Sequence, residues 1–146
     1  MDYLEWHLVP TDAILNNPLD VKQQTIPLTG VLNTVEYANE DGLNMIILDA
    51  CRNNPFPTGR RGGAGLAKST PPGGTIIAYS TSPGNVASDG DGDNGLYTSQ
   101  LVKQLRVPQR IEDVFMKTRI SVEEISDGAQ KPWEEARLKG IFYLTF

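Results

Sequence analysis

Apolar positions along the chain fall either into short continuous runs or into helical spacing. The run MIIL, within residues 44–49, is one of the first kind, and TIIAYS, residues 75–80, is another. Short apolar runs between turn residues predict buried strands, so we expect strands over both segments. A further strand is predicted over residues 1–10, where Pro10 ends it, and a last one over 140–144.

Three other segments repeat apolar residues at spacings of three and four, which predicts amphipathic helices. The first begins at Pro27, a residue suited to a first helical turn, and ends before residues 39–42. The second spans residues 96–105, and the third runs from Ile111 to Asp127-Gly128. Polar or Gly- and Pro-rich composition predicts loops over 14–24, 53–74 and 81–95.

This order of strands and helices predicts a layered α/β architecture, and 146 residues suffice for one core of ordinary size. No apolar run approaches the roughly 20 residues of a membrane-spanning helix, and the first ten residues lack the features of a secretory signal. We therefore expect a cytoplasmic protein. A net charge of -5 argues against a general nucleic-acid-binding surface.

The chain's candidate chemistry stands at the end of the strand 44–49, the end at which open α/β sheets bind ligands. Asp49 lies there, and Cys51, the only cysteine, follows two residues later. A single cysteine cannot form an internal disulfide. It is either a small buried apolar side chain or a nucleophile, and a nucleophilic thiolate needs a base or a positive field.

The segment DACRNNPF, residues 49–56, resembles the nucleophile motif of caspase-like cysteine peptidases, in particular bacterial orthocaspases and metacaspases. Two further segments resemble this family in the same order, AYSTSPGNVASDGDGDNGLYTSQLVKQL from Ala78 and QKPW…LKGIFYL from Gln130. YLEWHLVPTDA, near the N-terminus, is similar to a segment of bacterial members. The resemblance implies one caspase-like α/β domain, a sheet flanked by helices, over residues 1–146. Its expected parts are a nucleophile-bearing part (1–56), an exposed loop (57–73) and a small-subunit-like part (74–146).

The resemblance implies peptide-bond hydrolysis through an acyl-cysteine intermediate, with Cys51 as nucleophile and no cofactor. Asp49 matches the position that lines the pocket for P1, the residue before the scissile bond. Asp89 falls where animal caspases carry the arginine that binds a P1 aspartate. Two carboxylates would favour Arg or Lys at P1 through charge-assisted hydrogen bonds, which identifies peptides or proteins with basic P1 residues as partners. A solvated turn residue is the alternative for Asp89.

This chain departs from the family at the catalytic histidine, which normally stands in a His-Gly context. The single histidine, His7, precedes Leu8 and lies 44 residues before Cys51. That separation is close to the roughly 50 residues of the caspase signature, so His7 is one candidate for the general base. The alternative is a base in a segment ahead of this sequence, with a sheet incomplete at its N-terminal side. Rival hypotheses are a non-catalytic module that binds peptides or partner proteins, and a fragment that needs a complementing N-terminal segment or domain.

Two loop features leave further alternatives open. Asp89 begins a D-x-D-x-D run typical of a calcium loop, but Asn94 and Gln100 occupy the positions where an EF-hand has Gly and Glu. Calcium activation is thus an alternative to a cofactor-free enzyme. Arg60-Arg61 lies where caspase-like enzymes are cut between subunits. Self-cleavage after one of these arginines, or an ordinary solvated basic loop, would account for the pair.

Overall fold

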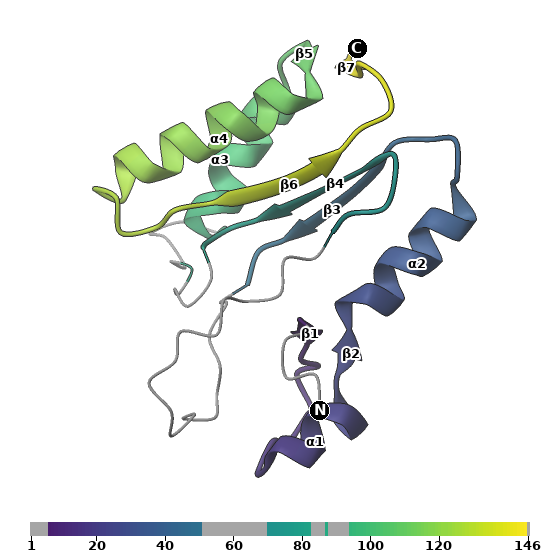
Figure 1. Cartoon of the computed structure of the whole chain (residues 1–146). Coiled ribbons are helices and arrows are strands. Elements are labelled where there is room, and N and C mark those ends of the chain that lie inside the picture. The colour runs from purple at the N-terminus through teal and green to yellow at the C-terminus, as the bar shows by residue number, and fades with distance from the viewer. Residues whose placement is uncertain (1–5, 51–69, 83–86, 88–93, 146) are drawn as a thin grey trace.

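The fold is organised around a three-stranded sheet with the order β3-β4-β6. The computed structural model describes residues 6–50, 70–82, 87 and 94–145. β3 and β4 run parallel, and β6 runs antiparallel to β4. Helices α3 and α4 cover one face of this sheet, and α2 covers the other (Figure 1). The bounds of these elements are α2 Leu28–Ala38, β3 Asn44–Leu48, β4 Thr75–Tyr79, α3 Leu96–Leu105, α4 Ile111–Ile125 and β6 Trp133–Arg137.

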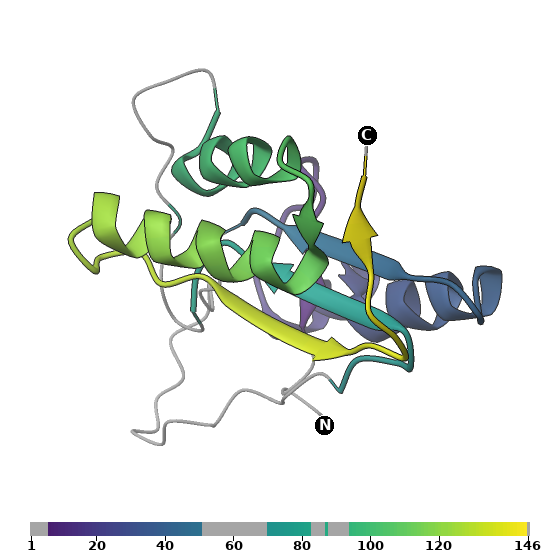
Figure 2. The same cartoon turned by 90° about the horizontal axis from the view of Figure 1, so that it is seen from above.

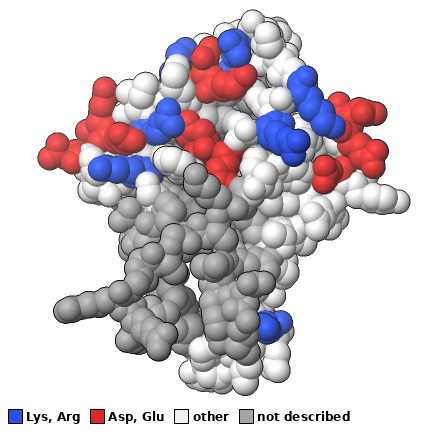
Figure 3. Space-filling model, viewed as in Figure 1, with Lys and Arg blue, Asp and Glu red and all other residues white. Residues whose placement is uncertain are grey.

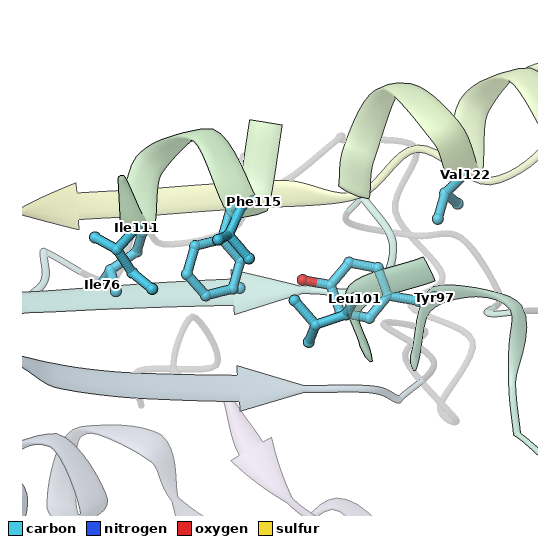
Figure 4. Packing of buried hydrophobic residues seen from close by; sticks show 8 residues of the cluster. Ile76, Tyr97, Leu101, Ile111, Phe115 and Val122 are labelled. Carbon is cyan, nitrogen blue, oxygen red and sulfur yellow. The ribbon is translucent and has the colours of Figure 1, made fainter. Parts of the chain in front are cut away.

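The central strand β4 is buried along its whole length, as its apolar run predicts. Its side chains alternate between the two faces of the sheet. Ile76 and Ala78 pack against residues of α3 and α4 (Figure 4). Ile77 and Tyr79 pack on the opposite face against residues of α2. The side chains of β4 therefore contribute to the apolar core on both faces of the sheet, and they hold the helices of each face against it.

The three predicted helices are present with their apolar faces turned inward. Leu28 and Leu32 of α2 are buried, one helical turn apart. The second helix, α3, has the predicted bounds, and α4 ends just before Asp127 and Gly128, which both adopt positive φ. A positive φ is the usual way to stop an α-helix. Figure 2 shows α3 and α4 side by side over the sheet, and none of the described helices is long and apolar enough to cross a membrane.

The prediction of a loop over residues 14–24 is wrong, because α1 (Pro18–Gln24) forms there. The Asn17 side chain accepts a hydrogen bond from Leu19 N, and the Asp20 carboxylate accepts one from Asn17 N. Pro18 at the first helical position is already restricted to a helical φ. These local interactions make a short helix without any buried residue, so its polar sequence carries no apolar stripe.

The C-terminal strands also differ from the prediction. β6 covers residues 133–137, over which the hydrophobic pattern predicted no strand. The predicted strand over 140–144 is reduced to β7 (Tyr143–Leu144). β7 pairs with β5 (Gln109–Arg110), outside the main sheet. The strand that completes the sheet is therefore the charged one and not the apolar one.

The N-terminal strands are present but more exposed than predicted. Within the predicted strand 1–10, the described residues contain β1 (His7–Leu8), which pairs with β2 (Ile26–Pro27). In β3, Met45 and Ile47 are 42% and 40% exposed, so the expectation of a fully buried strand is wrong for this side of β3. The reason is topological, because β3 lies at the edge of the described sheet and α3 and α4 pack mainly over β4.

Candidate functional site

The candidate site lies at the edge where the parallel strands β3 and β4 end. Asp49 follows the last residue of β3 and is exposed. Ser80 follows the last residue of β4, and its amide N–H donates to the Leu48 carbonyl over 2.9 Å. This bond extends the parallel pairing by one residue and brings the two strand ends together. The structure thus places Asp49 at the carboxyl edge of the sheet, as its position in the sequence indicated.

The Asp49 carboxylate is held by the first turn of α3. Thr98 Oγ1 donates a hydrogen bond to Asp49 Oδ2, with 2.5 Å between the oxygens. The helix begins at Leu96, and its N-cap residue, Gly95, offers no side chain to the free amides of the first turn. A carboxylate near such a helix N-terminus is stabilised by the helix dipole. The ion pairs found among the described residues do not include Asp49, so no cation there neutralises its charge.

A second carboxylate, that of Glu134 on β6, belongs to the same face of the sheet. Burial raises the pKa of Glu134, and the nearby Arg119 guanidinium opposes this shift through an ion pair of 2.5 Å. Tyr97, the neighbour of Thr98, lies within the field of both acids. Burial raises the pKa of the Tyr97 hydroxyl, and the charges of Glu134 and Asp49 raise it further. Tyr97 therefore remains neutral. Glu134 is paired with Arg119, whereas Asp49 is exposed.

Two side-chain hydrogen bonds fix the end of β4 to the segment that precedes β6. Gln130 Nε2 donates to the Ser80 carbonyl over 2.8 Å, and both residues are almost fully buried. Ser82 Oγ donates to the Lys131 carbonyl over 2.7 Å. The segment before β6 is therefore bonded twice to the segment that leaves β4. These bonds fix residues 80 and 82 relative to the start of β6.

The structure places His7 in the two-stranded β1–β2 ribbon, on the side of the sheet that α2 covers (Figure 1). Its Nδ1 lies 2.8 Å from Thr25 Oγ1, and the Thr25 hydroxyl donates to the Val21 carbonyl. A hydrogen bond therefore joins the His7 ring to the residue that ends α1.

Several predicted site residues lie outside the described part of the chain. These are Cys51, Asp89, Arg60 and Arg61. Most of the candidate calcium run, from Asp89 to Asp93, lies outside it too. Within the described ranges, no group of three or more His, Cys, Asp or Glu side chains could hold a metal ion. The roles predicted for these residues stay predictions.

Charged side chains are mixed on the face that Figure 3 shows. Lys and Arg alternate with Asp and Glu around the elements of the sheet and of α3 and α4, and the coloured atoms form no large area of a single sign.

Sequence reasoning missed Thr98 as a site residue. It lies 49 positions from Asp49, so no local motif joins the two. The available signal was indirect, since a helix that starts soon after a parallel strand brings its first turn to the same edge of the sheet.

The parallel strands β3 and β4 place Asp49 at the carboxyl edge of the sheet, against the first turn of α3. This arrangement is that of an α/β domain with a candidate site at the carboxyl edge. The model of the caspase domain matches residues 7–143, and the chain belongs to the caspase family. This match confirms the resemblance and the caspase-like α/β fold, and identifies a caspase-like protease or a relative of one. A search of curated proteins found no match.

Proposed function

We propose that the chain is a cysteine endopeptidase of the metacaspase type that cleaves peptides after Arg or Lys. The observation that carries this proposal is the exposed Asp49 carboxylate at the end of β3, two residues before Cys51. Its charge is held in place by a neutral hydroxyl and is not cancelled by an ion pair with a described residue. A carboxylate in this position attracts a guanidinium or ammonium group and repels an acidic P1 side chain.

In the proposed reaction, the Cys51 thiolate attacks the scissile carbonyl carbon of the substrate. The backbone N–H of Cys51 helps to hold the oxyanion, and Asp49, joined by Asp89, binds the basic P1 side chain. The leaving amine departs with a proton from the general base, and an acyl-cysteine remains. Water then releases the acid and restores the thiol. His7 is the candidate base within this chain, because it is the single histidine of the sequence.

The second candidate is a caspase-like module that binds peptides or partner proteins without cleaving them. The position of His7 favours it, because the ring belongs to the β1–β2 ribbon and its hydrogen bond goes to Thr25 and not to the strand ends. A fragment that becomes active with a complementing N-terminal segment or domain is a variant of this hypothesis. A cytoplasmic location also stays a prediction.

The test compares fluorogenic peptides that differ only in Arg, Lys or Asp at P1, each with and without calcium. We expect turnover of the Arg and Lys peptides that Cys51→Ala abolishes. Absence of Cys51-dependent turnover, combined with binding of the basic peptides, would establish the non-catalytic module. Preference for Asp at P1 would refute the proposed specificity. A calcium requirement would decide between the two cofactor predictions.

Two substitutions assign the roles of the site. Asp49→Asn should lower kcat/KM for the Arg peptide about ten- to a hundredfold, because it removes one charge-assisted hydrogen bond. Asp41→Asn is the matched control, since it removes the same charge from an exposed residue just before the start of β3, at the opposite end of that strand. His7→Ala should reduce kcat about a hundredfold or more if His7 is the base, and should leave it unchanged otherwise.

A further inference from the structure

We infer that Thr98 is a positioning residue for substrate selection: its hydroxyl fixes the Asp49 carboxylate in the orientation that receives a basic P1 side chain. This inference rests on the proposed function and names a residue that selects through Asp49. The hydrogen bond from Thr98 Oγ1 to Asp49 Oδ2 is the observation behind it. It joins the end of β3 to the first turn of α3 across 49 residues of sequence.

The contact restrains a side chain that would otherwise be free to rotate. Asp49 is exposed, and an exposed aspartate populates several rotamers at little cost. A ligand that must capture one of them loses affinity in proportion to the fraction of molecules in that state. A hydrogen bond from a fixed donor removes this penalty before the ligand arrives, which is the general benefit of preorganisation.

Thr98 is suited to be a fixed donor, because α3 itself is immobilised by its buried neighbours. Tyr97 and Leu101 are 2% and 4% exposed and belong to the core cluster that packs on β4 (Figure 4). Threonine is β-branched, so its χ1 is restricted within a helix. The hydroxyl therefore has a defined place relative to the sheet, and Asp49 is bonded to the scaffold and not to another mobile side chain.

The donor is also neutral, and this determines the chemistry of the pocket. A lysine or arginine in the place of Thr98 would orient Asp49 equally well but would cancel its charge. The hydroxyl bonds Oδ2 and carries no charge of its own, so it leaves the negative charge of the carboxylate to attract a guanidinium or ammonium group. Thr98 should consequently affect ligands with a charged P1 side chain and leave neutral ones unaffected.

The experiment measures how fast Cys51 is labelled by peptidyl acyloxymethyl ketones with either arginine or its neutral isostere citrulline at P1. The thiolate displaces the acyloxy group as a carboxylate and leaves a thioether, which intact-protein mass spectrometry quantifies. The readout is the ratio of the arginine rate to the citrulline rate. Alkylation by iodoacetamide reports the general reactivity of the thiol in each variant, and the ratio of the two peptidyl rates cancels any change in that reactivity.

Thr98→Val keeps the shape of the side chain and removes the donor. We expect it to lower the arginine-to-citrulline ratio about three- to tenfold, because the carboxylate is no longer held in one orientation. Thr98→Ser should restore most of the ratio. Thr34→Val is the matched control, because the Thr34 hydroxyl is exposed and bonds the Gly30 carbonyl within α2, far along the chain from the site. Thr98→Ala serves as a second donor-free variant if the valine destabilises the helix.

The decisive comparison is a double-mutant cycle with Asp49→Asn. If Thr98 acts through Asp49, Thr98→Val should have no further effect on the ratio in the Asp49→Asn background. An equal loss in both backgrounds, or an unchanged ratio for both donor-free variants, would overturn the inference and leave the proposed function standing. A ratio near one for the unmodified protein would instead refute basic selectivity itself, and the role of Thr98 with it.

Discussion

The hydrogen bond between Gln130 and the end of β4 makes a prediction about stability. Gln130 Nε2 donates to the Ser80 carbonyl over 2.8 Å, and Gln130 and Ser80 are 2% and 0% exposed. Gln130→Met keeps nearly the same length and flexibility but supplies no donor. Because water cannot reach the buried carbonyl to replace the lost donor, we expect a cost of about 1–3 kcal/mol in the free energy of unfolding.

Gln109→Met is the matched control. Gln109 Nε2 donates to the Gln104 carbonyl over the same 2.8 Å, but Gln109 is only half-buried. Water can replace that donor, so its loss should cost less than about 1 kcal/mol. The residue type, the bond length and the substitution are the same in both variants. Gln109→Met also removes a 3.3 Å bond to Gln104 Oε1 and the acceptor of the exposed Lys117 Nζ bond, so a smaller cost for Gln109→Met in spite of these extra losses would show the effect of burial.

Equilibrium unfolding in urea, followed by circular dichroism and by tryptophan fluorescence, measures the two costs. For a slope of about 2 kcal/mol per molar urea, a loss of about 2 kcal/mol moves the midpoint by about 1 M. Coincidence of the two probes checks that unfolding is two-state. Equal midpoint shifts for Gln130→Met and Gln109→Met would refute the reasoning, because burial would then add nothing to the value of the bond.

Two further substitutions test the capping of α1 and the buried acid of β6. Asn17→Ala should cost about 1 kcal/mol in urea unfolding, because it removes the acceptor for Leu19 N, and Asn17→Asp should retain most of the stability. The pKa of Glu134 in the folded protein lies above its ordinary value of 4.5. The folded state therefore binds the carboxyl proton more tightly than the unfolded chain does, and the free energy of unfolding falls as the pH rises and Glu134 ionises. Glu134→Gln should therefore gain stability relative to wild type between about pH 4 and pH 7; a relative loss would show that the Arg119 ion pair outweighs burial.

Most of the central fold could be predicted because its signals are local and strong. The five residues of β4 are apolar or small and all are buried, so a continuous run was sufficient to find them. The helix at residues 96–105 carries buried residues at helical spacing, with Tyr97 and Leu101 four positions apart. In these segments, packing follows the same pattern that the sequence displays.

The elements that escaped prediction are stabilised by interactions that a hydrophobic pattern does not contain. α1 depends on the capping box between Asn17 and Asp20, and it buries none of its residues. β6 is an edge strand whose sequence, WEEAR, lacks the alternation of a half-buried strand. Its ladder with β4 and the ion pair of Glu134 with Arg119 hold it in place. Partners distant in sequence determine such strands, as they determine the exposure of Met45 and Ile47 on β3.

In the candidate site, one residue could be predicted from the sequence and its neighbour could not. Tyr97 was foreseeable from periodicity, because it is part of the apolar face of α3, whereas the contact of Thr98 with Asp49 required the tertiary arrangement. The two roles are nevertheless coupled, since the burial of Tyr97 fixes the rotation of the helix and so sets the direction of the Thr98 hydroxyl. A shift of α3 that placed Thr98 at the buried position of Tyr97 would carry the hydroxyl into the core and away from Asp49. The register that packs the core is therefore also the register that orients the acid.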